Sequence, residues 1–187
     1  MPRSTGSSAP PELPIDAARV RLRWLVPGDA GAIYRMSQED GMRARLPSQV
    51  YRDEAHAASV VAFLIARYRD PADPRLGPYV LGVELAVSAE LIGHVGLSPL
   101  DGGVEVGFAI AQAHQRQGLA TAAVRAACEW AANAFALPKI LGIAAADNMA
   151  SHGVLLQAGF VRKADRAMHF QGREQAVACF EFTAPEV

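Results

Sequence analysis

Apolar and polar residues alternate along several short stretches of the chain, and this alternation predicts strands. The alternating stretches are residues 19–25, 79–86, 91–97 and 104–110. A period of two places every second side chain on one face, so such strands bury one face and expose the other. Turn residues at 88–90 and 101–103 separate the last three stretches. We therefore expect three consecutive antiparallel strands over residues 79–110. A half-buried strand at 19–25 precedes them, with its three arginines on a solvated face.

Helical spacing of apolar residues replaces the alternation in three other segments. Residues 30–39, 53–68 and 119–136 carry apolar positions every three or four residues, which predicts amphipathic helices. Asp29 precedes the first of them and is expected to cap it, because a carboxylate accepts hydrogen bonds from the free N–H groups of a first turn. Residues 40–52 have no regular pattern. We expect this segment to line the entrance of a site, since irregular exposed segments tend to carry specificity.

The second half of the chain alternates strands and helices. Residues 139–146 form a continuous apolar run, which predicts a strand buried on both faces. With the strand at 104–110 and the helix at 119–136 it makes a right-handed βαβ unit. Residues 147–158 predict a capped helix that ends at Gly159 as a left-handed C-cap, and a strand follows from Phe160. Residues 166–170 and 174–182 predict a closing hairpin across Gln171 and Gly172.

Composition and charge limit the classes of function. The chain has 187 residues, 51% of them hydrophobic, and a net charge of −1, so it can bury a full core and has no overall attraction to nucleic acid or an anionic membrane. We expect a flexible tail over residues 1–14 and one domain over residues 15–187. No apolar run reaches the roughly 20 residues of a membrane span, and the N-terminus lacks the apolar region of a signal peptide.

Cysteine and histidine usage points to a reducing compartment and to no metal. Cys128 and Cys179 do not make a disulfide framework, so a cytoplasmic protein is expected. The five histidines have no ligand spacing with one another or with cysteine, and we expect no metal site.

The loop at residues 115–120 reads QRQGLA and lies where a strand ends and the long helix begins. The first turn of a helix leaves N–H groups unpaired and carries the positive end of the helix dipole. Gly118 and Ala120 keep the main chain bare, so these N–H groups can wrap a phosphate. An ordinary strand-to-helix turn has the same small residues. The Walker lysine and the three-glycine dinucleotide fingerprint are both missing, so an anion here would be a pyrophosphate held by main-chain amides without a metal.

The order of these features resembles the GNAT superfamily of acyl-CoA-dependent N-acyltransferases. Hairpin strands are followed by the Q-x-x-G-x-A loop at 115–120, a helix, a buried strand, N-x-x-S at 148–151 and G-F at 159–160. The resemblance covers the chain from about residue 15 to its end. The closest branch resembles the ribosomal-protein N-terminal acetyltransferases, for which V-E-V-G-F at 104–108 and F-x-G-R at 170–173 are typical.

The resemblance implies an α+β fold with a mixed, mostly antiparallel central sheet of about seven strands, splayed in a V and flanked by helices. It implies acetyl-CoA as cosubstrate in the cleft of the V, with its pyrophosphate on the amides of residues 116–121. A homodimer is a further expectation from the family. The residues expected to bind the coenzyme are Phe108, Ala109, Ile110, Gln115, Arg116, Gln117, Gly118, Leu119, Ala120, Thr121, Asn148 and Ser151.

The sequence departs from the wider family in its last predicted helix. Many relatives carry a tyrosine there as general acid, where this chain has Leu155. A tyrosine acid is therefore not expected. Ser151 becomes the candidate for hydrogen bonding to the departing sulfur, with a buried first-turn hydroxyl as its structural alternative. Gly153 stands where the branch commonly has a basic residue, so we expect fewer contacts to the nucleotide phosphates.

The candidates for catalysis are Glu105, Ser151 and Asn148. Acetyl transfer needs a neutral amine, a donor to the thioester oxygen and a donor to the leaving thiolate. An α-amino group with a pKa of about 8 needs only a weak base, whereas a lysine amine near 10.4 is almost fully protonated at pH 7. Glu105 alternates to the face opposite Val104 and Val106 and can take the proton directly or through water. A solvated strand carboxylate is the equal alternative.

His94 and Asn148 each have a structural alternative as well. His94 can help to bind or deprotonate the acceptor, or it is a packed, hydrogen-bonded histidine. Asn148 can bond to the pantetheine arm or to a catalytic water, or it only caps the helix that follows it.

We therefore expect an N-acetyltransferase that moves an acetyl group from acetyl-CoA to a primary amine by direct attack in a ternary complex. The acceptor is the α-amine of a protein N-terminus or a small-molecule amine, and no motif decides between them. A non-catalytic acyl-CoA-binding sensor or interaction module is the alternative, against which the presence of Glu105 and Ser151 argues. A doubly wound nucleotide-binding fold is disfavoured by the early antiparallel strands.

Overall fold

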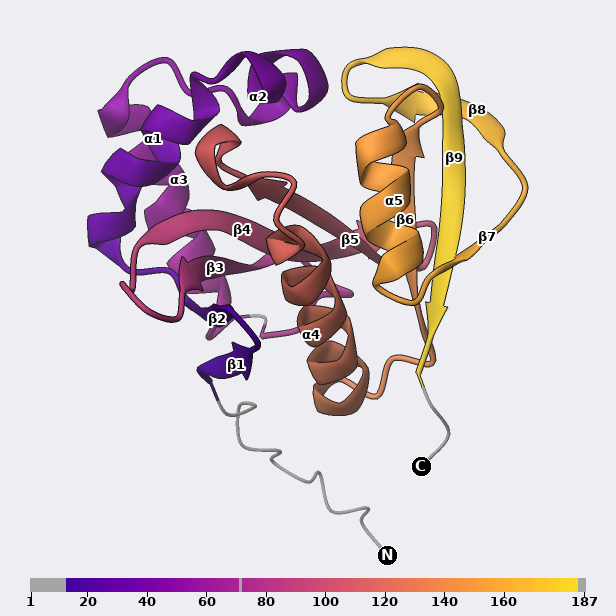
Figure 1. Cartoon of the computed structure of the whole chain (residues 1–187), viewed down its shortest axis with the longest axis horizontal. Helices are drawn as coiled ribbons and strands as arrows, with labels where there is room; N and C mark the ends of the chain where they lie inside the picture. The colour runs from indigo at the N-terminus through magenta and orange to yellow at the C-terminus, as the bar shows by residue number, and fades with distance from the viewer. Residues whose placement is uncertain (1–12, 71, 185–187) are drawn as a thin grey trace, which may run out of the picture.

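The computed structural model describes residues 13–70 and 72–184 of the chain. The expected flexible tail lies outside these residues, apart from Leu13 and Pro14. Figure 1 shows an open sheet that runs through the molecule with helices packed along it. The strand order is β1-β2-β3-β4-β5-β6-β9-β7, and β8 also pairs with β9. The predicted α+β class is confirmed.

Within the described part of the chain nine strands form the sheet, where about seven were expected. Part of the difference comes from β1 and β7, which have only three and two residues, because such short strands show no alternation. The strands are β1 (Ile15–Ala17), β2 (Val20–Trp24), β3 (Tyr79–Leu85), β4 (Leu91–Leu100), β5 (Gly103–Ile110), β6 (Lys139–Ala145), β7 (Val161–Arg162), β8 (Arg166–Phe170) and β9 (Arg173–Thr183).

The helices agree with the predicted segments except at residues 40–52. The α-helices are α1 (Ala30–Ser37), α2 (Asp40–Arg45), α3 (Glu54–Arg67), α4 (Leu119–Ala134) and α5 (Met149–Gln157), and the 3₁₀ helices are η1 (Pro27–Asp29), η2 (Pro47–Gln49) and η3 (Gln112–His114). The expectation of an irregular segment at 40–52 was wrong, since α2 and η2 lie there. Six and three residues hold too few apolar positions to show a helical period. Gly159 follows α5 with φ +102, as predicted.

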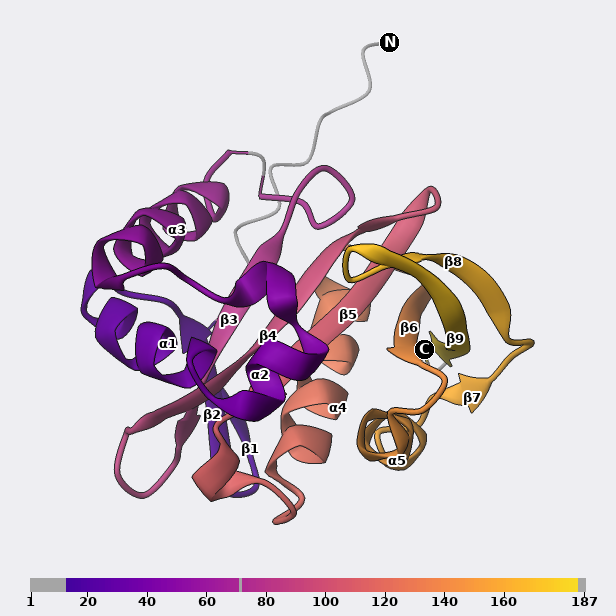
Figure 2. The same cartoon turned by 90° about the horizontal axis from the view of Figure 1, so that it is seen from above.

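The sheet opens between β5 and β6. Among the described strands these two are the parallel neighbours, and they share only two residue pairs, Glu105 with Leu141 and Val106 with Gly142. Beyond Val106 the strands diverge, which gives the predicted V. Figure 2 shows the two arms, with β1–β5 and α1–α3 on one side and β6–β9 and α5 on the other. The helix α4 is the crossover between β5 and β6.

Small residues allow α4 and α5 to lie close to the sheet. Ala123, Ala127 and Ala131 of α4 are at most 1% exposed and belong to the main core. On the other arm, a Cβ at Gly142 would lie 2.8 Å from Leu155 Cδ2, so α5 rests directly on β6. Because β5 and β6 are parallel, the loops that follow them lie at the same edge of the sheet. The N-termini of α4 and α5 therefore meet at the opening of the V.

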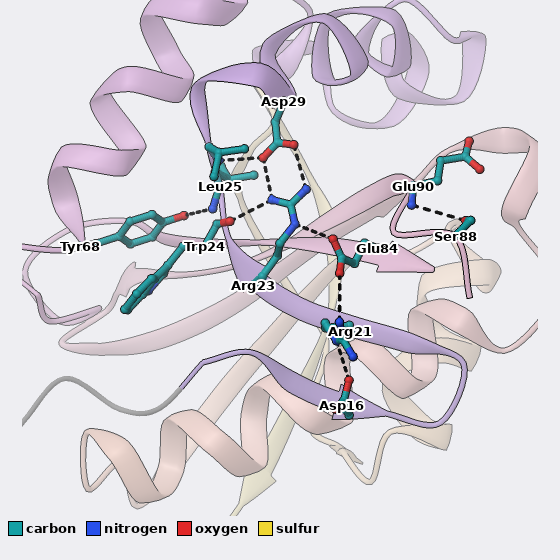
Figure 3. Close-up of polar contacts among 11 residues, drawn as sticks. Asp16, Arg21, Arg23, Trp24, Leu25, Asp29, Tyr68, Glu84, Ser88 and Glu90 are labelled. Atoms are coloured by element: carbon teal, nitrogen blue, oxygen red, sulfur yellow. Dashed lines mark hydrogen bonds and ion pairs between the residues drawn. The ribbon is translucent and has the colours of Figure 1, made fainter. Parts of the chain in front are cut away.

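Arg23 lies in a buried ionic network, which corrects the expectation of a solvated arginine face (Figure 3). Its guanidinium donates to Asp29 at 2.8 and 2.9 Å and to Glu84 at 2.6 Å. Asp29 and Glu84 are only 5% and 6% exposed. The carboxylate of Asp29 also accepts from the Val26 N–H at 2.8 Å, so it braces the turn before α1 and does not cap the helix. The hydrogen bonds to Asp29 and then Glu84 raise the pKa of Arg23 above its usual range, against its partial desolvation.

Replacing Arg23 with methionine is expected to lower the free energy of unfolding by about 3 kcal/mol, because buried Asp29 loses its cation. Buried Glu84 keeps only the more distant Arg21, at 3.9 Å. The control is Arg75→Met, which removes an exposed ion pair with Asp73 at 2.8 Å and should cost less than about 1 kcal/mol. Urea denaturation followed by tryptophan fluorescence measures both. Equal losses in the two variants would contradict the buried network.

Candidate active site

The loop between β5 and α4 leaves a row of main-chain N–H groups free. The Gln115 N–H donates to Gln112 O at 3.3 Å, and the Ala122 N–H donates to Gly118 O at 3.1 Å. Between them, the N–H groups of residues 116–121 make no hydrogen bond to any described residue. These six groups lie at the start of a 16-residue helix, where the dipole is positive. This is the geometry that binds phosphate groups through the main chain.

Two left-handed residues shape the loop. Arg116 has φ +58 and Gly118 has φ +76. A Cβ at Gly118 would meet no atom within 4 Å, so the space in front of this residue is open. The backbone conformation at position 118 favours glycine and disfavours β-branched residues, which rarely adopt positive φ.

The two glutamines of the loop use their side chains to hold it in place. Gln115 Nε2 donates to Ile110 O at 2.8 Å, and Gln117 Nε2 donates to Ala113 O at 3.4 Å. Both were expected to bind the coenzyme. The Gln117 side chain is exposed and does not line the cleft, so Gln117 can contribute only its main-chain N–H.

A cleft of about 1270 Å³ occupies the opening of the V. Small-molecule sites measure roughly 300–1,000 Å³, so this cleft has room for a coenzyme and an acceptor together. It extends from the loop at 115–121, between β5 and β6, to α2, η2 and the β8–β9 hairpin. The predicted site residues that line it are Glu105, Phe108, Ala109, Ile110, Gln115, Arg116, Gly118, Leu119, Ala120, Thr121, Asn148 and Ser151. The fold thus brings together all of them except Gln117.

Glu105 lies half-buried on the cleft wall. It faces Ser98 across the β4–β5 ladder, and both residues line the cleft. Desolvation, and to a smaller extent the charge of Asp101, raises the pKa of Glu105. A carboxylate with a raised pKa is a stronger base. Its surroundings are therefore those of a cleft residue and not of a solvated strand position.

His94 lies on the same face of the sheet, opposite Ala109. Its Nε2 is 2.9 Å from Gln49 Oε1 of η2, and desolvation lowers the pKa of His94 to about 4. The ring is therefore neutral at pH 7. His94 is thus a packed, hydrogen-bonded histidine, which was one of the two alternatives from the sequence. Its side chain also lines the cleft.

Asn148 and Ser151 mark the start of α5. Asn148 Oδ1 accepts from the Ser151 N–H at 3.2 Å, so Asn148 is the helix cap, and both side chains line the cleft. Leu155, one turn further along, is 1% exposed and belongs to the core. The Leu155 side chain therefore packs between α5 and the sheet and does not line the cleft. Gly153 lines the cleft with no atom within 4 Å of a Cβ.

Sequence reasoning missed the side chains of the far wall. This wall includes Arg45, Gln49, Phe170, Arg173 and Gln175. Arg45 Nη1 lies 2.7 Å from Asp147 Oδ1, and Ser48 Oγ donates to Gln171 Oε1 at 3.0 Å. The two arms of the V thus touch here, and Figure 1 shows α2 beside the β8–β9 turn. The partners are 102 and 123 residues apart in the chain, and no local pattern marks them. The segment at 40–52 does line the cleft, as predicted.

Residues 13–70 and 72–184 contain no group of three His, Cys, Asp or Glu side chains that could hold a metal ion. None of the helices in these ranges combines the length and hydropathy of a membrane span. Cys128 and Cys179 are free thiols.

Residues 19–161 match the acetyltransferase (GNAT) domain family. The N-acetyltransferase YoaA of Bacillus subtilis (strain 168), itself named as uncharacterized, is 26% identical over 152 residues, which cover 80% of this chain and 83% of YoaA. The family match over residues 19–161 includes the loop at 115–120, the start of α5 and Glu105.

Solved structures of acetyltransferases share the fold. Ribosomal-protein-S5-alanine acetyltransferase from Vibrio fischeri is 16% identical with a TM-score of 0.74, covering 92% of this chain and 97% of its own. Mycobacterium smegmatis RimJ in complex with CoA-disulfide is 21% identical with a TM-score of 0.74, covering 88% and 82%. These neighbours include ribosomal-protein acetyltransferases, the branch that the sequence resembles. The chain belongs to the GNAT acetyltransferase family and is an acetyltransferase of that family.

Proposed function

We propose that the protein transfers an acetyl group from acetyl-CoA to a primary amine, which attacks the thioester directly in a ternary complex. The observation that carries the proposal is the row of free N–H groups at residues 116–121, which opens into the cleft that Glu105 lines. The complex of RimJ with CoA-disulfide supports a coenzyme of this class in this fold. The coenzyme supplies the activated acetyl group, and the protein supplies binding and proton transfer.

Two parts of the V are suited to hold the coenzyme. The N–H groups of residues 116–121 suit its pyrophosphate. Beyond Val106, β5 has no partner on the β6 side among the described strands. The Ala111 N–H donates to Ile92 O of β4, so the main-chain groups of Phe108 and Ile110, which alternate with it, point to that open edge. An extended chain of amides can pair with an open strand edge as an added strand does. The pantetheine arm has such amides, and we assign it to this edge.

Glu105, Ser151 and Asn148 have separate roles in the transfer. Glu105 accepts the proton that the amine loses, directly or through a water. Ser151 donates a hydrogen bond toward the sulfur that leaves as a thiolate. Asn148 holds the first turn of α5 through its cap, and thereby keeps Ser151 at the cleft.

The acceptor we favour is the α-amine of a protein N-terminus, with a small-molecule amine as the second class. An α-amine with a pKa of about 8 is partly neutral at pH 7 and needs only one half-buried carboxylate as base. The fold shared with a ribosomal-protein-S5-alanine acetyltransferase supports this choice. We also propose that residues 15–187 act as one N-acetyltransferase domain, that the protein is cytoplasmic, and that it forms a homodimer.

The proposal is tested by thiol release from acetyl-CoA in the presence of N-terminal peptides and small amines. We expect saturable turnover with at least one amine, and a roughly tenfold lower kcat for Ser151→Ala, with the Kd for acetyl-CoA unchanged, because Ser151 acts on the leaving group. Saturable coenzyme binding without turnover on any amine would favour the sensor alternative. An unchanged kcat in Ser151→Ala would remove Ser151 from the mechanism.

A further inference from the structure

A strip of bare backbone crosses the cleft face of the sheet. Gly96 of β4 and Gly107 of β5 are directly opposite each other in the ladder, and both line the cleft. Gly107 is exposed although it lies in the interior of a central strand. No side chain therefore covers Gly107, whereas Val80 borders Gly96, with its Cγ2 3.1 Å from where a Cβ at Gly96 would lie.

The protein itself gives no reason for a glycine at position 107. A Cβ there would meet no atom within 4 Å, and the backbone is outside the left-handed region. Other glycines on these strands are explained by close packing, since a Cβ at Gly93 would lie 2.3 Å from Ala109 O and one at Gly82 would lie 2.8 Å from Leu91 Cδ1. A glycine inside a strand weakens it and marks a place where a ligand approaches the backbone.

The strip lies between the two groups best placed to handle an amine. Glu105 and Ala109 flank Gly107 along β5, and Ser98 and His94 flank Gly96 along β4. Residues two apart on one face are separated by roughly 6.5–7 Å. A substrate carbon that rests on the two glycines thus places the amine attached to it within reach of the Glu105 carboxylate. The other end of the strip is closed by His94, whose Nε2 is held by Gln49 at 2.9 Å.

Building on the proposed function, we infer that Gly96 and Gly107 form the floor of the acceptor subsite, and that Gly107 determines how large a group next to the reacting amine can be. The acceptor that suits this floor is the first residue of an extended peptide, because its α-carbon and side chain can lie flat on two adjacent strands. Gly107 is then a specificity-determining residue. Its missing side chain leaves space that the substrate fills.

The experiment compares Gly107→Ala and Gly107→Val with Gly103→Ala. Gly103 lies on the same strand and face but outside the cleft, and its Cβ would meet only Leu100 O at 3.5 Å. The substrates are acetyl-CoA and hexapeptides that differ only in their first residue, Gly, Ala, Ser or Leu. We expect the peptide KM to rise roughly tenfold or more for each added methyl group, with the largest loss for Leu. The Kd for acetyl-CoA, measured by calorimetry without peptide, should change less than twofold.

Three results would overturn the inference. The first is an unchanged peptide KM in a folded Gly107→Val that binds acetyl-CoA. The second is a rise of the acetyl-CoA Kd in proportion to the peptide KM, which would put the coenzyme on the floor. The third is an equal loss in Gly103→Ala, which would make the effect structural. A wild-type protein that acetylates no peptide or amine would overturn the proposed function, and the inference with it. Circular dichroism and thermal unfolding establish whether each variant is folded. If Gly107→Val does not fold, Gly107→Ala is used for the test.

Discussion

Replacing Gly118 with valine is expected to weaken acetyl-CoA binding at least a hundredfold. Gly118 has φ +76, a conformation that a β-branched residue avoids, and its missing Cβ faces open space at the free N–H groups. Valine would turn the N–H groups away from one another, and it would place a methyl group in the proposed pyrophosphate site. Losing several charge-assisted hydrogen bonds, each worth about 1.5–3 kcal/mol, is sufficient for this effect. Calorimetric titration with acetyl-CoA measures it.

Gly102→Val is the matched control for this substitution. Gly102 lies in the β4–β5 turn outside the cleft, with φ +74 and no atom within 4 Å of a Cβ. The two variants should lose similar stability, about 1–2 kcal/mol, because both force a side chain into the left-handed region. Only Gly118→Val should lose coenzyme affinity. An unchanged Kd in a folded Gly118→Val would mean that the loop is an ordinary strand-to-helix turn.

Replacing Glu105 with glutamine is expected to lower kcat/KM for the amine about a hundredfold to a thousandfold, because the site loses its base. In the wild type, kcat should fall as the pH drops through the pKa of Glu105, which desolvation raises above its ordinary value near 4.5. The glutamine variant should lack this acid limb. Initial rates between pH 4.5 and 8.5 measure both. If the Glu105→Gln variant kept wild-type rates, Glu105 would not be the base and water would have to accept the proton.

The Glu105→Gln substitution is expected to maintain or raise the unfolding temperature at pH 7, although it lowers activity. The folded-state pKa of Glu105 lies above its unfolded value, so the contribution of this group to stability is largest below the unfolded pKa and is lost as the pH rises through the folded pKa. At pH 7 the charged carboxylate is the disfavoured form, and Glu105→Gln should unfold at the wild-type temperature or higher. At pH 4 the difference should shrink. The control is Glu174→Gln, an exposed carboxylate outside the cleft, which should change neither activity nor stability.

Local patterns sufficed for the longer elements and for the loop that we propose binds the coenzyme. Alternation placed β3, β4 and β5, and helical spacing placed α3 and α4, because each buries one face along a continuous segment. The loop at 115–120 could be recognised because its proposed function depends on consecutive main-chain N–H groups, which one short stretch of sequence provides. The family followed from the order of such stretches along the chain.

Tertiary structure decided whatever depends on residues that are distant in the chain. The environment of Arg23 depends on Asp29 and on Glu84 from another strand. The alternation within its own strand therefore wrongly predicted a solvated side chain. The acceptor side needs β4 beside β5 and α2 beside the β8–β9 turn, contacts that span as many as 123 residues. The bare floor at Gly96 and Gly107 exists only because the ladder places them opposite each other. A sequence pattern reports which face a residue takes on its own element, whereas the partner on that face is set by how the elements pack.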